Sequence, residues 1–387
     1  MKVGIMTCWQ PDDNYGTQIQ CFALQHYLRN AGHEAFLIRY VRANDTTRSV
    51  PLKTVLKALN PYLVARKFHS LLRHRKMIEE TAMHDRDAPQ FRERYLCMSR
   101  TYNSHAELLL NPPEADAYIV GSDQVWNNVP HQTGQFDSFF LNFGGDSVMR
   151  IAYAASFGFG PDRIPKGYGS RARPLLDRFD GISVREQSGI SILSGLGVRN
   201  AVVVADPTLL LDAAYYRKIY GENDVPAQRR KYVLAYNLSS KSNLDAEKIR
   251  EWADEKGLDF VYITGHGQAD RLEKCYARIP QWLYLIDNAE YVFTNSFHGA
   301  IFSLLFHKKF VVFKLCGNHE ITNSRLDTIE NLISSERIVA SMDEALSVMD
   351  APIDWDLFER RKDSLAAAGK EFLDEHLYTG GRKERNE

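Results

Sequence analysis

The sequence predicts an α/β fold made of two Rossmann-like domains that face each other across a cleft. Strand-like and helix-like patterns alternate along most of its 387 residues, and this alternation is typical of parallel sheets covered by helices. A chain of this length also exceeds one ordinary domain. Near its middle, the residues Gly221-Glu-Asn-Asp-Val-Pro-Ala-Gln have the composition of a linker. We therefore expect two α/β units of similar construction.

The first domain is predicted over residues 1–212. A strand at 2–7, a helix at 17–31 and a strand at 34–40 form its βαβ opening. Residues 51–95 form an inserted basic segment, in which lysines and arginines punctuate apolar positions of helical spacing. Further strands are predicted at residues 117–122, 150–156, 181–185 and 201–206.

The second domain is predicted over residues 231–350, after a linker at 213–230. The last segment, residues 351–387, contains a long helix at 355–376 with one polar face, and we expect this helix to cross back to the first domain. The elements expected in the second domain are strands at 232–237, 259–264, 291–293 and 310–314, and helices at 244–256, 281–288 and from Gly299 onward.

The composition excludes several classes of function. Lys+Arg 48 against Asp+Glu 49 leaves a net charge of -1, which lacks the basic excess of a nucleic-acid-binding protein. No run of about 18 apolar residues could span a bilayer, and the first residues form a strand that lacks the apolar stretch of a signal peptide. The five cysteines are scattered and show no CxxC spacing, so neither disulfides nor a zinc site is predicted. The sequence shows no other metal-ligand spacing, and no bound cofactor is predicted. We therefore expect a cytoplasmic protein.

The segment from Tyr291 to Phe306 places one histidine, His298, where an apolar strand gives way to an apolar helix. A strand end beside a helix start exposes unpaired N–H groups, and open α/β sheets bind anions at such positions. We expect His298 to lie where a phosphate or carboxylate binds, with Asn295 and Ser296 beside it. The alternative interpretation is that His298 caps the helix or completes a buried polar network.

Polar side chains also follow the strands of the first domain. Asp123 and Gln124 follow one strand, Ser156 follows the next, and Arg185 follows a third. The planar guanidinium of Arg185 suits a carboxylate or phosphate, but a structural salt bridge with Glu186 or a helix cap is an equal alternative. Asp206, in Asp206-Pro-Thr, is interpreted as a residue that organises a turn.

The first loop, Asp12-Asp13-Asn14-Tyr15-Gly16, precedes a helix and is interpreted as a binding loop for a ligand with sugar hydroxyl groups. Gly16 permits close approach of a ligand to the backbone, and Asp13 or Asn14 suits a hydroxyl group better than a phosphate because two adjacent acids repel an anion. Asn14 or Thr17 is also a candidate helix cap.

Cations follow His298 in the second domain. Lys314 and Arg325 are the two expected to lie near the anion. Arg325 is the first choice because it lies in a polar loop that opens a helix.

Several of these motifs together resemble the polysaccharide pyruvyl transferase family. The resemblance covers nearly the whole chain. It implies a fold like that of the two-domain GT-B glycosyltransferases, and transfer of pyruvate from phosphoenolpyruvate to a sugar of a surface or capsular polysaccharide precursor, with formation of a cyclic ketal. It rests on Asn14-Tyr-Gly, Gly121-Ser-Asp-Gln-Val-Trp-Asn, Ala155-Ser-Phe-Gly, Ser183-Val-Arg-Glu, Asp206-Pro-Thr and Thr294-Asn-Ser-Phe-His-Gly.

The resemblance also implies roles for individual residues. His298 matches a histidine that acts on the donor, and Arg185 matches an arginine that binds the donor's anionic groups. Many relatives have arginine where this chain has Ser296, so Arg325 or Lys314 is expected to supply the missing cation.

The expected chemistry assigns proton transfer to two of these groups. His298 would donate a proton to the methylene carbon of phosphoenolpyruvate or stabilise the departing phosphate. Asp123 would accept the proton of the attacking hydroxyl, or else cap the end of its strand.

Two other functions remain open from the sequence. A nucleotide-sugar glycosyltransferase of the GT-B type would use the same cleft, and a non-catalytic sugar-binding relative is favoured if His298 and Arg185 point into the core. The inserted basic segment also has two interpretations. It either contacts anionic lipid at the inner face of the membrane, where a lipid-linked acceptor would lie, or packs on the first domain. The oligomeric state is not predicted.

Overall fold

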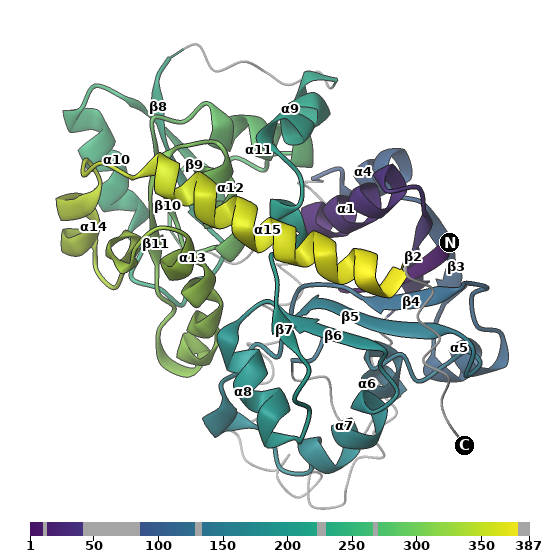
Figure 1. Ribbon diagram of the computed structural model, residues 1–387. Helices are drawn as coiled ribbons and strands as arrows, with labels where there is room; N and C mark the ends of the chain where they lie inside the picture. The colour runs from purple at the N-terminus through teal and green to yellow at the C-terminus, as the bar shows by residue number, and fades with distance from the viewer. Residues whose placement is uncertain (11–13, 42–85, 128–133, 223–229, 266–269, 378–387) are drawn as a thin grey trace, which may run out of the picture.

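The computed structural model describes residues 1–10, 14–41, 86–127, 134–222, 230–265 and 270–377 (Figure 1). These residues form two parallel sheets with helices packed on them, as the fold class predicted from the sequence requires. Asp13 and residues 51–85, which make up most of the inserted basic segment, lie outside the described residues.

The first sheet has the strand order β3-β2-β1-β4-β5-β6-β7, and its paired strands run parallel. Its centre is apolar on both faces because helices cover both sides, and every residue of β4 is buried. The strands are β1 (Lys2–Met6), β2 (Glu34–Tyr40), β3 (Met98–Tyr102), β4 (Ala117–Val120), β5 (Met149–Ala155), β6 (Gly181–Val184) and β7 (Val202–Val203).

The first helix, α1 (Tyr15–Asn30), begins two residues before its predicted start. The reason is the cap: the side chain of Asn14 accepts a hydrogen bond from the N–H of Thr17 at 3.4 Å. Gly32, with φ of 88°, follows the end of the helix in the left-handed region. The other helices of this domain are α4 (Ala88–Tyr95), α5 (His105–Leu110), α6 (Gly134–Phe139), α7 (Tyr168–Leu176) and α8 (Gln187–Gly195), with short 3-10 turns η1 (Pro161–Arg163) and η2 (Pro207–Leu209).

The second sheet has the strand order β12-β11-β10-β8-β9 and is also parallel. Its strands are β8 (Tyr232–Asn237), β9 (Asp259–Thr264), β10 (Tyr291–Thr294), β11 (Lys309–Phe313) and β12 (Ile338–Val339). Its helices are α10 (Ala246–Glu255), α11 (Ile279–Asp287), α12 (Phe297–Leu305), α13 (Asp327–Leu332) and α14 (Met342–Val348), with 3-10 segments η3 (Gly317–Leu326) and η4 (Ser335–Arg337).

The structure adds elements that the sequence patterns did not predict. β3 and β12 are edge strands, and an edge strand needs no apolar pattern because one side of it is unpaired. Helix α9 (Ala213–Gly221) occupies the first part of the segment assigned to the linker. It forms a helix there because Tyr216 and Ile219 bury one face, which packs against α11.

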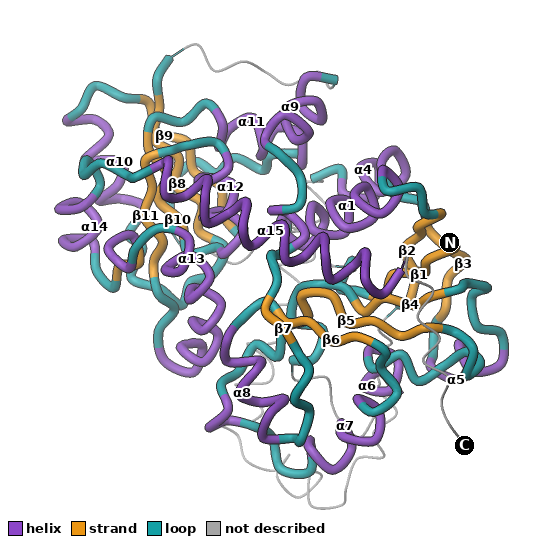
Figure 2. Tube along the Cα trace, viewed as in Figure 1, coloured by secondary structure: helices purple, strands orange, loops and turns teal. Residues whose placement is uncertain are grey.

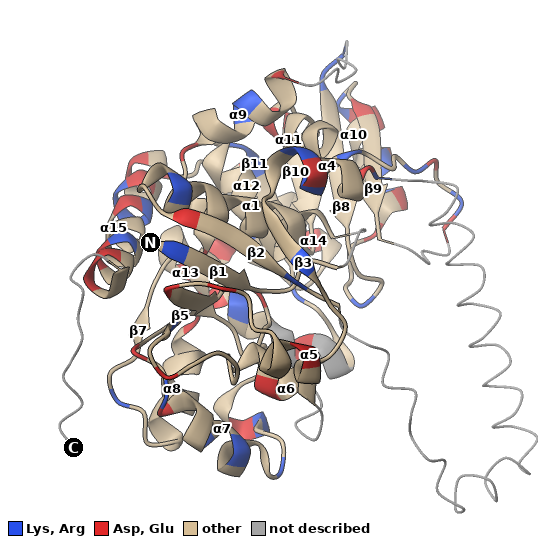
Figure 3. Cartoon of the chain, turned by 90° about the vertical axis from the view of Figure 1, so that its right-hand side faces the viewer, with Lys and Arg blue, Asp and Glu red and all other residues tan. Residues whose placement is uncertain are grey.

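The last helix, α15 (Trp355–Leu377), crosses from the second domain to the first, which confirms the prediction (Figure 1, yellow). Near its start it packs on α13, and near its end the ring of Phe372 lies 6.4 Å from that of Tyr153 in β5. Basic and acidic residues are both present along the helix (Figure 3). In the part of the chain that the structure describes, no helix combines the length and the apolar character needed to cross a membrane.

The two domains share one apolar cluster, which includes Ile19 of α1, Tyr236 of β8 and Phe302 of α12. The ring of Tyr15, at the start of α1, stacks on that of Trp282 in α11 with 5.2 Å between ring centroids. Figure 2 shows α1 and α12 between the two sets of strands, and these helices contact each other. The carboxyl ends of β1 and β10, from which the two helices emerge, therefore meet at the domain boundary.

Candidate active site

His298 lies where the N-terminal ends of two helices meet. Ser296 caps α12, since its Oγ accepts the N–H of Gly299 at 3.2 Å, and His298 is the second residue of that helix. Against its ring lies Gly16, the second residue of α1. The first N–H groups of a helix lack partners within the helix and carry partial positive charge. The meeting of two such ends therefore favours a bound anion.

Gly16 is the residue that allows α1 to approach His298. A Cβ atom at Gly16 would lie 2.2 Å from Nδ1 of His298 and 2.4 Å from its Cγ, distances that an ordinary side chain cannot adopt. A ligand was predicted to approach the backbone closely at Gly16, and in the structure the imidazole of His298 does so. The predicted contact between Gly16 and an acceptor stays a prediction.

Asp206 is the centre of a buried polar network next to His298. Its Oδ2 accepts hydrogen bonds from Nη1 of Arg185 at 3.0 Å and from Oγ of Ser122 at 2.9 Å. Its Oδ1 accepts the N–H and the hydroxyl of Thr208 at 3.0 and 2.6 Å. Nε2 of His298 lies 3.7 Å from the same Oδ2, which is long for a hydrogen bond but within reach of an ion pair when the imidazole is protonated.

The network keeps Asp206 ionised. Burial alone raises the pKa of a carboxyl group, but the contacts with His298, Arg185 and Thr208 outweigh burial and hold the pKa of Asp206 far below its usual value. The carboxylate is completely buried, so its negative charge acts on His298 with little screening by water.

Arg185 is occupied by protein carboxylates. Its Nε donates to Oε1 of Glu186 at 3.0 Å, its Nη1 donates to Asp206, and its guanidinium lies 4.4 Å from the centroid of the Phe297 ring. Burial alone would lower the pKa of Arg185, and the charges of Glu186 and Asp206 reverse this effect and raise it. The geometry matches the salt-bridge alternative left open by the sequence, with Asp206 as an additional partner. Donor binding by Arg185 stays a prediction.

Asp123 lies at the end of the first-domain strand β4 and faces α1. Its Oδ2 accepts the hydroxyl of Thr17 at 3.0 Å, and its Oδ1 accepts the N–H of Gln124 at 2.8 Å. Its backbone has φ of 76°, a conformation that costs free energy in a residue other than glycine. The carboxylate is therefore held in one orientation beside the N-terminal end of α1.

The other predicted acceptor residues at these strand ends are bonded within the protein. The hydroxyl of Ser156 donates to Oε1 of Glu186 at 2.9 Å, and Oε1 of Gln124 accepts a hydrogen bond from Asn127. Both side chains therefore stabilise the strand ends, and their contact with an acceptor stays a prediction.

Asn295 ties the end of β10 to the end of β8. Its Oδ1 accepts the N–H of Leu238 at 2.8 Å, and its Nδ2 donates to Oδ1 of Asn237 at 2.7 Å. Ligand binding by Asn295 stays a prediction. It also stays a prediction for Asn14 and Ser296, which cap helices, and for Tyr15, whose ring stacks on Trp282.

The two cations predicted near the anion differ in their surroundings. Lys314 follows β11 and its side chain is exposed. Arg325 lies near the end of η3 and is partly buried, and the structure brings it close enough to Arg185 and Asp123 for their charges to act on it. The arginine thus lies with the strand-end groups of the first domain.

Sequence reasoning did not find the place of Asp206 or the contact between Thr17 and Asp123. The Asp206-Pro-Thr motif indicates a turn, and the turn is present, since Asp206 caps η2 through Thr208. The sequence also held a second signal, which indicates a site residue: Asp206 follows a predicted strand, as Asp123 follows its own strand.

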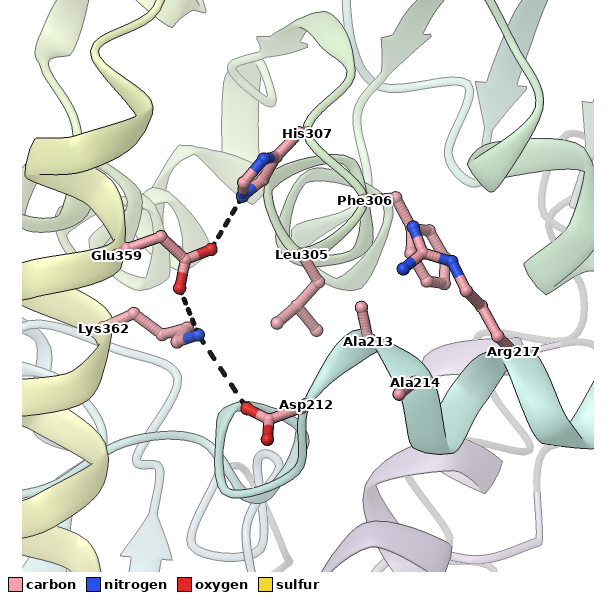
Figure 4. A pocket seen from close by; sticks show the side chains of 9 residues that line it. All are labelled: Asp212, Ala213, Ala214, Arg217, Leu305, Phe306, His307, Glu359 and Lys362. Atoms are coloured by element: carbon pink, nitrogen blue, oxygen red, sulfur yellow. Dashed lines mark hydrogen bonds and ion pairs between the residues drawn. The ribbon is translucent and has the colours of Figure 1, made fainter.

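A separate pocket of about 340 Å³ lies at the other end of α12, between α9, α12 and α15 (Figure 4). Nε2 of His307 and Oε1 of Glu359 are 2.7 Å apart there, and Lys362 pairs with Glu359 and lies 4.0 Å from Asp212. These contacts tie α15 to both domains. Among the described residues, no three His, Cys, Asp or Glu side chains are grouped to hold a metal ion.

Comparison with solved structures identifies the fold. UDP-GlcNAc 2-epimerase from Neisseria meningitidis, bound to UDP-GlcNAc, aligns over 97% of this chain and 100% of its own, with a TM-score of 0.54 and 10% identity. UDP-GlcNAc 2-epimerase from Methanocaldococcus jannaschii aligns over 96% of this chain and 100% of its own, with a TM-score of 0.53 and 12% identity. At these identities the similarity shows the fold alone, which is GT-B-like.

Sequence comparison identifies the family. No curated protein matches the chain. A family model for polysaccharide pyruvyl transferases matches residues 14–316, a range that includes Gly16, Asp206 and His298. The matched range covers most of the chain and extends into both domains, so the protein belongs to the polysaccharide pyruvyl transferase family.

Proposed function

We propose that this protein transfers pyruvate from phosphoenolpyruvate to a sugar of a surface or capsular polysaccharide precursor and forms a cyclic ketal. Membership of the family supports a transferase that acts on a sugar. The observation that carries the proposal is His298 between two helix N-terminal ends, with the carboxylate of Asp206 at 3.7 Å. Reaction with phosphoenolpyruvate needs an acid group beside a bound anion, and this arrangement suits both.

The proposed reaction forms two C–O bonds at one carbon. A proton adds to the methylene carbon of phosphoenolpyruvate, and a sugar hydroxyl adds to the neighbouring carbon and loses its proton. The bond from that carbon to the phosphate oxygen then breaks, and phosphate leaves with the electron pair. A second hydroxyl of the sugar attacks the same carbon and loses its proton to close the ketal. The methylene carbon takes up one proton and the two sugar hydroxyls release two. The leaving phosphate takes up the remaining proton.

His298 donates the first proton in this reaction. Asp206 stabilises the imidazolium before transfer and holds the ring in place, and the N-terminal ends of α1 and α12 stabilise the negative charge of the donor. Asp123 accepts the proton of the attacking hydroxyl, with its orientation set by Thr17. Positioned acid–base groups of this kind contribute about 10²–10⁴-fold to the rate.

The experiment that tests the proposal measures phosphate release from phosphoenolpyruvate in the presence of a panel of lipid-linked or aryl galactosides, mannosides and glucosides. We expect release with at least one acceptor, and a product whose mass exceeds that of the acceptor by pyruvic acid less one water. Release of phosphate without this product, or none across a panel that includes lipid-linked acceptors, would contradict the proposal.

A second candidate function is transfer of a sugar from a nucleotide. Its support is the GT-B-like fold, which this chain has in common with epimerases that act on UDP-GlcNAc. A ligand that binds only the folded state raises the midpoint of thermal unfolding. A rise with UDP and none with phosphoenolpyruvate would favour the nucleotide-sugar function. A non-catalytic sugar-binding protein would bind the acceptor without turnover of either donor.

A lipid-linked acceptor would place the protein at the cytoplasmic face of the membrane. The support is the run of lysines and arginines within residues 51–76, which suits anionic lipid. Co-sedimentation with anionic liposomes should weaken when Arg73, Arg75 and Lys76 are replaced by glutamate. Equal sedimentation of the wild type and this variant would remove the membrane contact from the proposal.

A further inference from the structure

Buried arginines elsewhere in this fold have partners for their guanidinium groups. Arg150 donates to backbone carbonyl oxygens between residues 141 and 148 at 2.8 to 3.3 Å. Arg185 donates to Glu186 and Asp206, both at 3.0 Å. This pairing is the rule because a buried charge without a partner is strongly unfavourable.

Arg325 differs from Arg150 and Arg185. Its Nε is buried and has no hydrogen-bond partner, and no carboxylate lies within ion-pair distance of its guanidinium in the ranges that the structure describes. The side chain as a whole is partly buried, so it is neither solvated like a surface arginine nor paired like Arg150. An arginine in this state has room for an anion as its hydrogen-bond and charge partner.

Arg325 lies at the boundary between the two domains, close enough to Arg185 and Asp123 of the first domain for their charges to act on it. The hydroxyl of Thr328, three residues further along the chain, lies 3.5 Å from the carbonyl oxygen of Arg185 in the first domain. On the other side, Tyr236 acts on Arg325, and the ring of Tyr236 lies near Gly299, the residue after His298, where an added Cβ would be 2.9 Å from Cδ1 of Tyr236. Arg325 therefore shares its surroundings with His298 and with the strand ends of the first domain.

The electrostatics of Arg325 agree with a missing anion. Burial and the positive charge of Arg185 lower the pKa of Arg325 to about 10, although Asp123 and Glu186 act in the opposite direction. The guanidinium is still charged at neutral pH. Its charged form is less favourable in the fold than in water, and a bound anion would restore the balance.

We propose that Arg325 is the cation that binds the phosphate group of the donor. Its geometry carries the inference: a partly buried guanidinium with an unpaired Nε, at the junction that also holds a histidine whose Nε2 is buried and has no hydrogen-bond partner. A guanidinium can donate two parallel hydrogen bonds to a phosphate, which suits this position. The identity of the ligand as phosphoenolpyruvate rests on the proposed function, whereas the phosphate site itself does not.

The test compares Arg325→Gln and Arg325→Lys with the wild type in the full-length protein. Without ligand, we expect Arg325→Gln to have a thermal midpoint equal to or above that of the wild type, because the variant removes an unpaired charge. With inorganic phosphate as the probe, the dissociation constant should rise about 10- to 100-fold, the usual effect of losing a hydrogen bond to a charged group. Arg325→Lys should retain part of the binding. Pyruvate, which lacks the phosphate, should bind both variants as it binds the wild type.

Two matched variants define the outcomes. Arg163→Gln removes an exposed arginine, whose side chain is 61% accessible, and should change neither stability nor phosphate binding. Arg150→Gln removes a buried arginine that donates hydrogen bonds to backbone carbonyl oxygens, and this variant should have a lower midpoint of thermal unfolding. If Arg325→Gln is destabilised like Arg150→Gln, or binds phosphate as tightly as the wild type, Arg325 is a structural residue and the inference is wrong.

Activity separates this inference from the proposed function. If the wild type converts phosphoenolpyruvate and Arg325→Gln keeps the wild-type KM, the function stands and the role of Arg325 falls. The other outcome is that the wild type does not convert phosphoenolpyruvate, and that inorganic phosphate binds the wild type but not Arg325→Gln. In that case the phosphate site stands and the donor is a different phosphate ester.

Discussion

The ionisable groups in the two halves of the site differ in how much of their hydrogen-bonding capacity is used within the protein. In the N-terminal half, Arg185, Asp206 and Asp123 are bonded to neighbouring side chains and backbone groups. In the C-terminal half, Nε2 of His298 and Nε of Arg325 are buried and have no hydrogen-bond partner within the described residues. Buried polar groups are nearly always bonded in native proteins. The difference indicates that the first half holds the shape of the site and that the second half faces the ligand.

The largest expected effect belongs to the C-terminal half. His298→Gln should lower the rate of phosphate release by about 10²–10⁴-fold, because the proposed proton donor is lost. The unfolding free energy should fall less than for a change at Asp206, since Nε2 of His298 has no hydrogen-bond partner within the described residues and lies 3.7 Å from Oδ2 of Asp206. Initial rates and urea denaturation of the same preparation measure both. Turnover of the variant near the wild-type rate would show that His298 is not the proton donor.

The next effect belongs to the N-terminal half and concerns stability. Asp206→Asn should lower the unfolding free energy by about 3–5 kcal/mol at neutral pH, because Arg185 is then left with an incomplete set of buried partners. Urea denaturation of the variant and the wild type measures this difference. A loss no larger than that of His298→Gln would remove the contrast between the two halves.

The same variant has a pH dependence whose sign follows from the lowered pKa of Asp206. A carboxyl whose pKa is lower in the folded state stabilises the fold fully above the pKa of the unfolded chain, near ~3.9 for aspartate. This stabilisation is lost as the pH falls below that value. The difference between wild type and Asp206→Asn should therefore shrink in urea denaturation near pH 3 relative to pH 7. A constant difference would show that the charge of Asp206 contributes nothing.

A smaller effect tests the contact between the halves. Gly16→Ala places a Cβ where the His298 ring now lies, so the ring or α1 must move. A displacement of this kind costs about 10²-fold in rate, and we expect a loss of about that size or less. The matched control is Gly195→Ala in α8, where a Cβ would meet no atom within 4 Å. Equal rates for the two alanine variants would show that the imidazole needs no fixed position.

Much of the fold follows from local patterns in the sequence. The apolar run from Tyr291 and the helix after it placed His298 at a strand–helix junction, and the long polar-faced helix was found almost to the residue, because both signals come from neighbouring residues. The short edge strands β3 and β12 carry no such pattern. The helix α9 was taken for a linker because its buried face depends on α11, which lies far along the chain.

The site was predictable only in part. The sequence placed Arg185 at a strand end and named Glu186 as one partner, since the two are adjacent. It did not pair Arg185 with Asp206, because that contact depends on two strands, β6 and β7, lying side by side in the sheet. The same limit applies to Gly16 and His298, whose contact joins the two domains. Long-range contacts of this kind decide which predicted residues hold one another and which remain free to hold a ligand.

A crystal structure of the protein with phosphoenolpyruvate bound, without acceptor, would test the division between the two halves most directly. We predict that oxygen atoms of the phosphate lie within hydrogen-bond distance of the Arg325 guanidinium, that His298 lies beside the methylene carbon, and that Arg185 keeps its bonds to Glu186 and Asp206. The opposite arrangement would contradict the division: the phosphate bound to Arg185 after its release from Asp206, with Arg325 still without a partner.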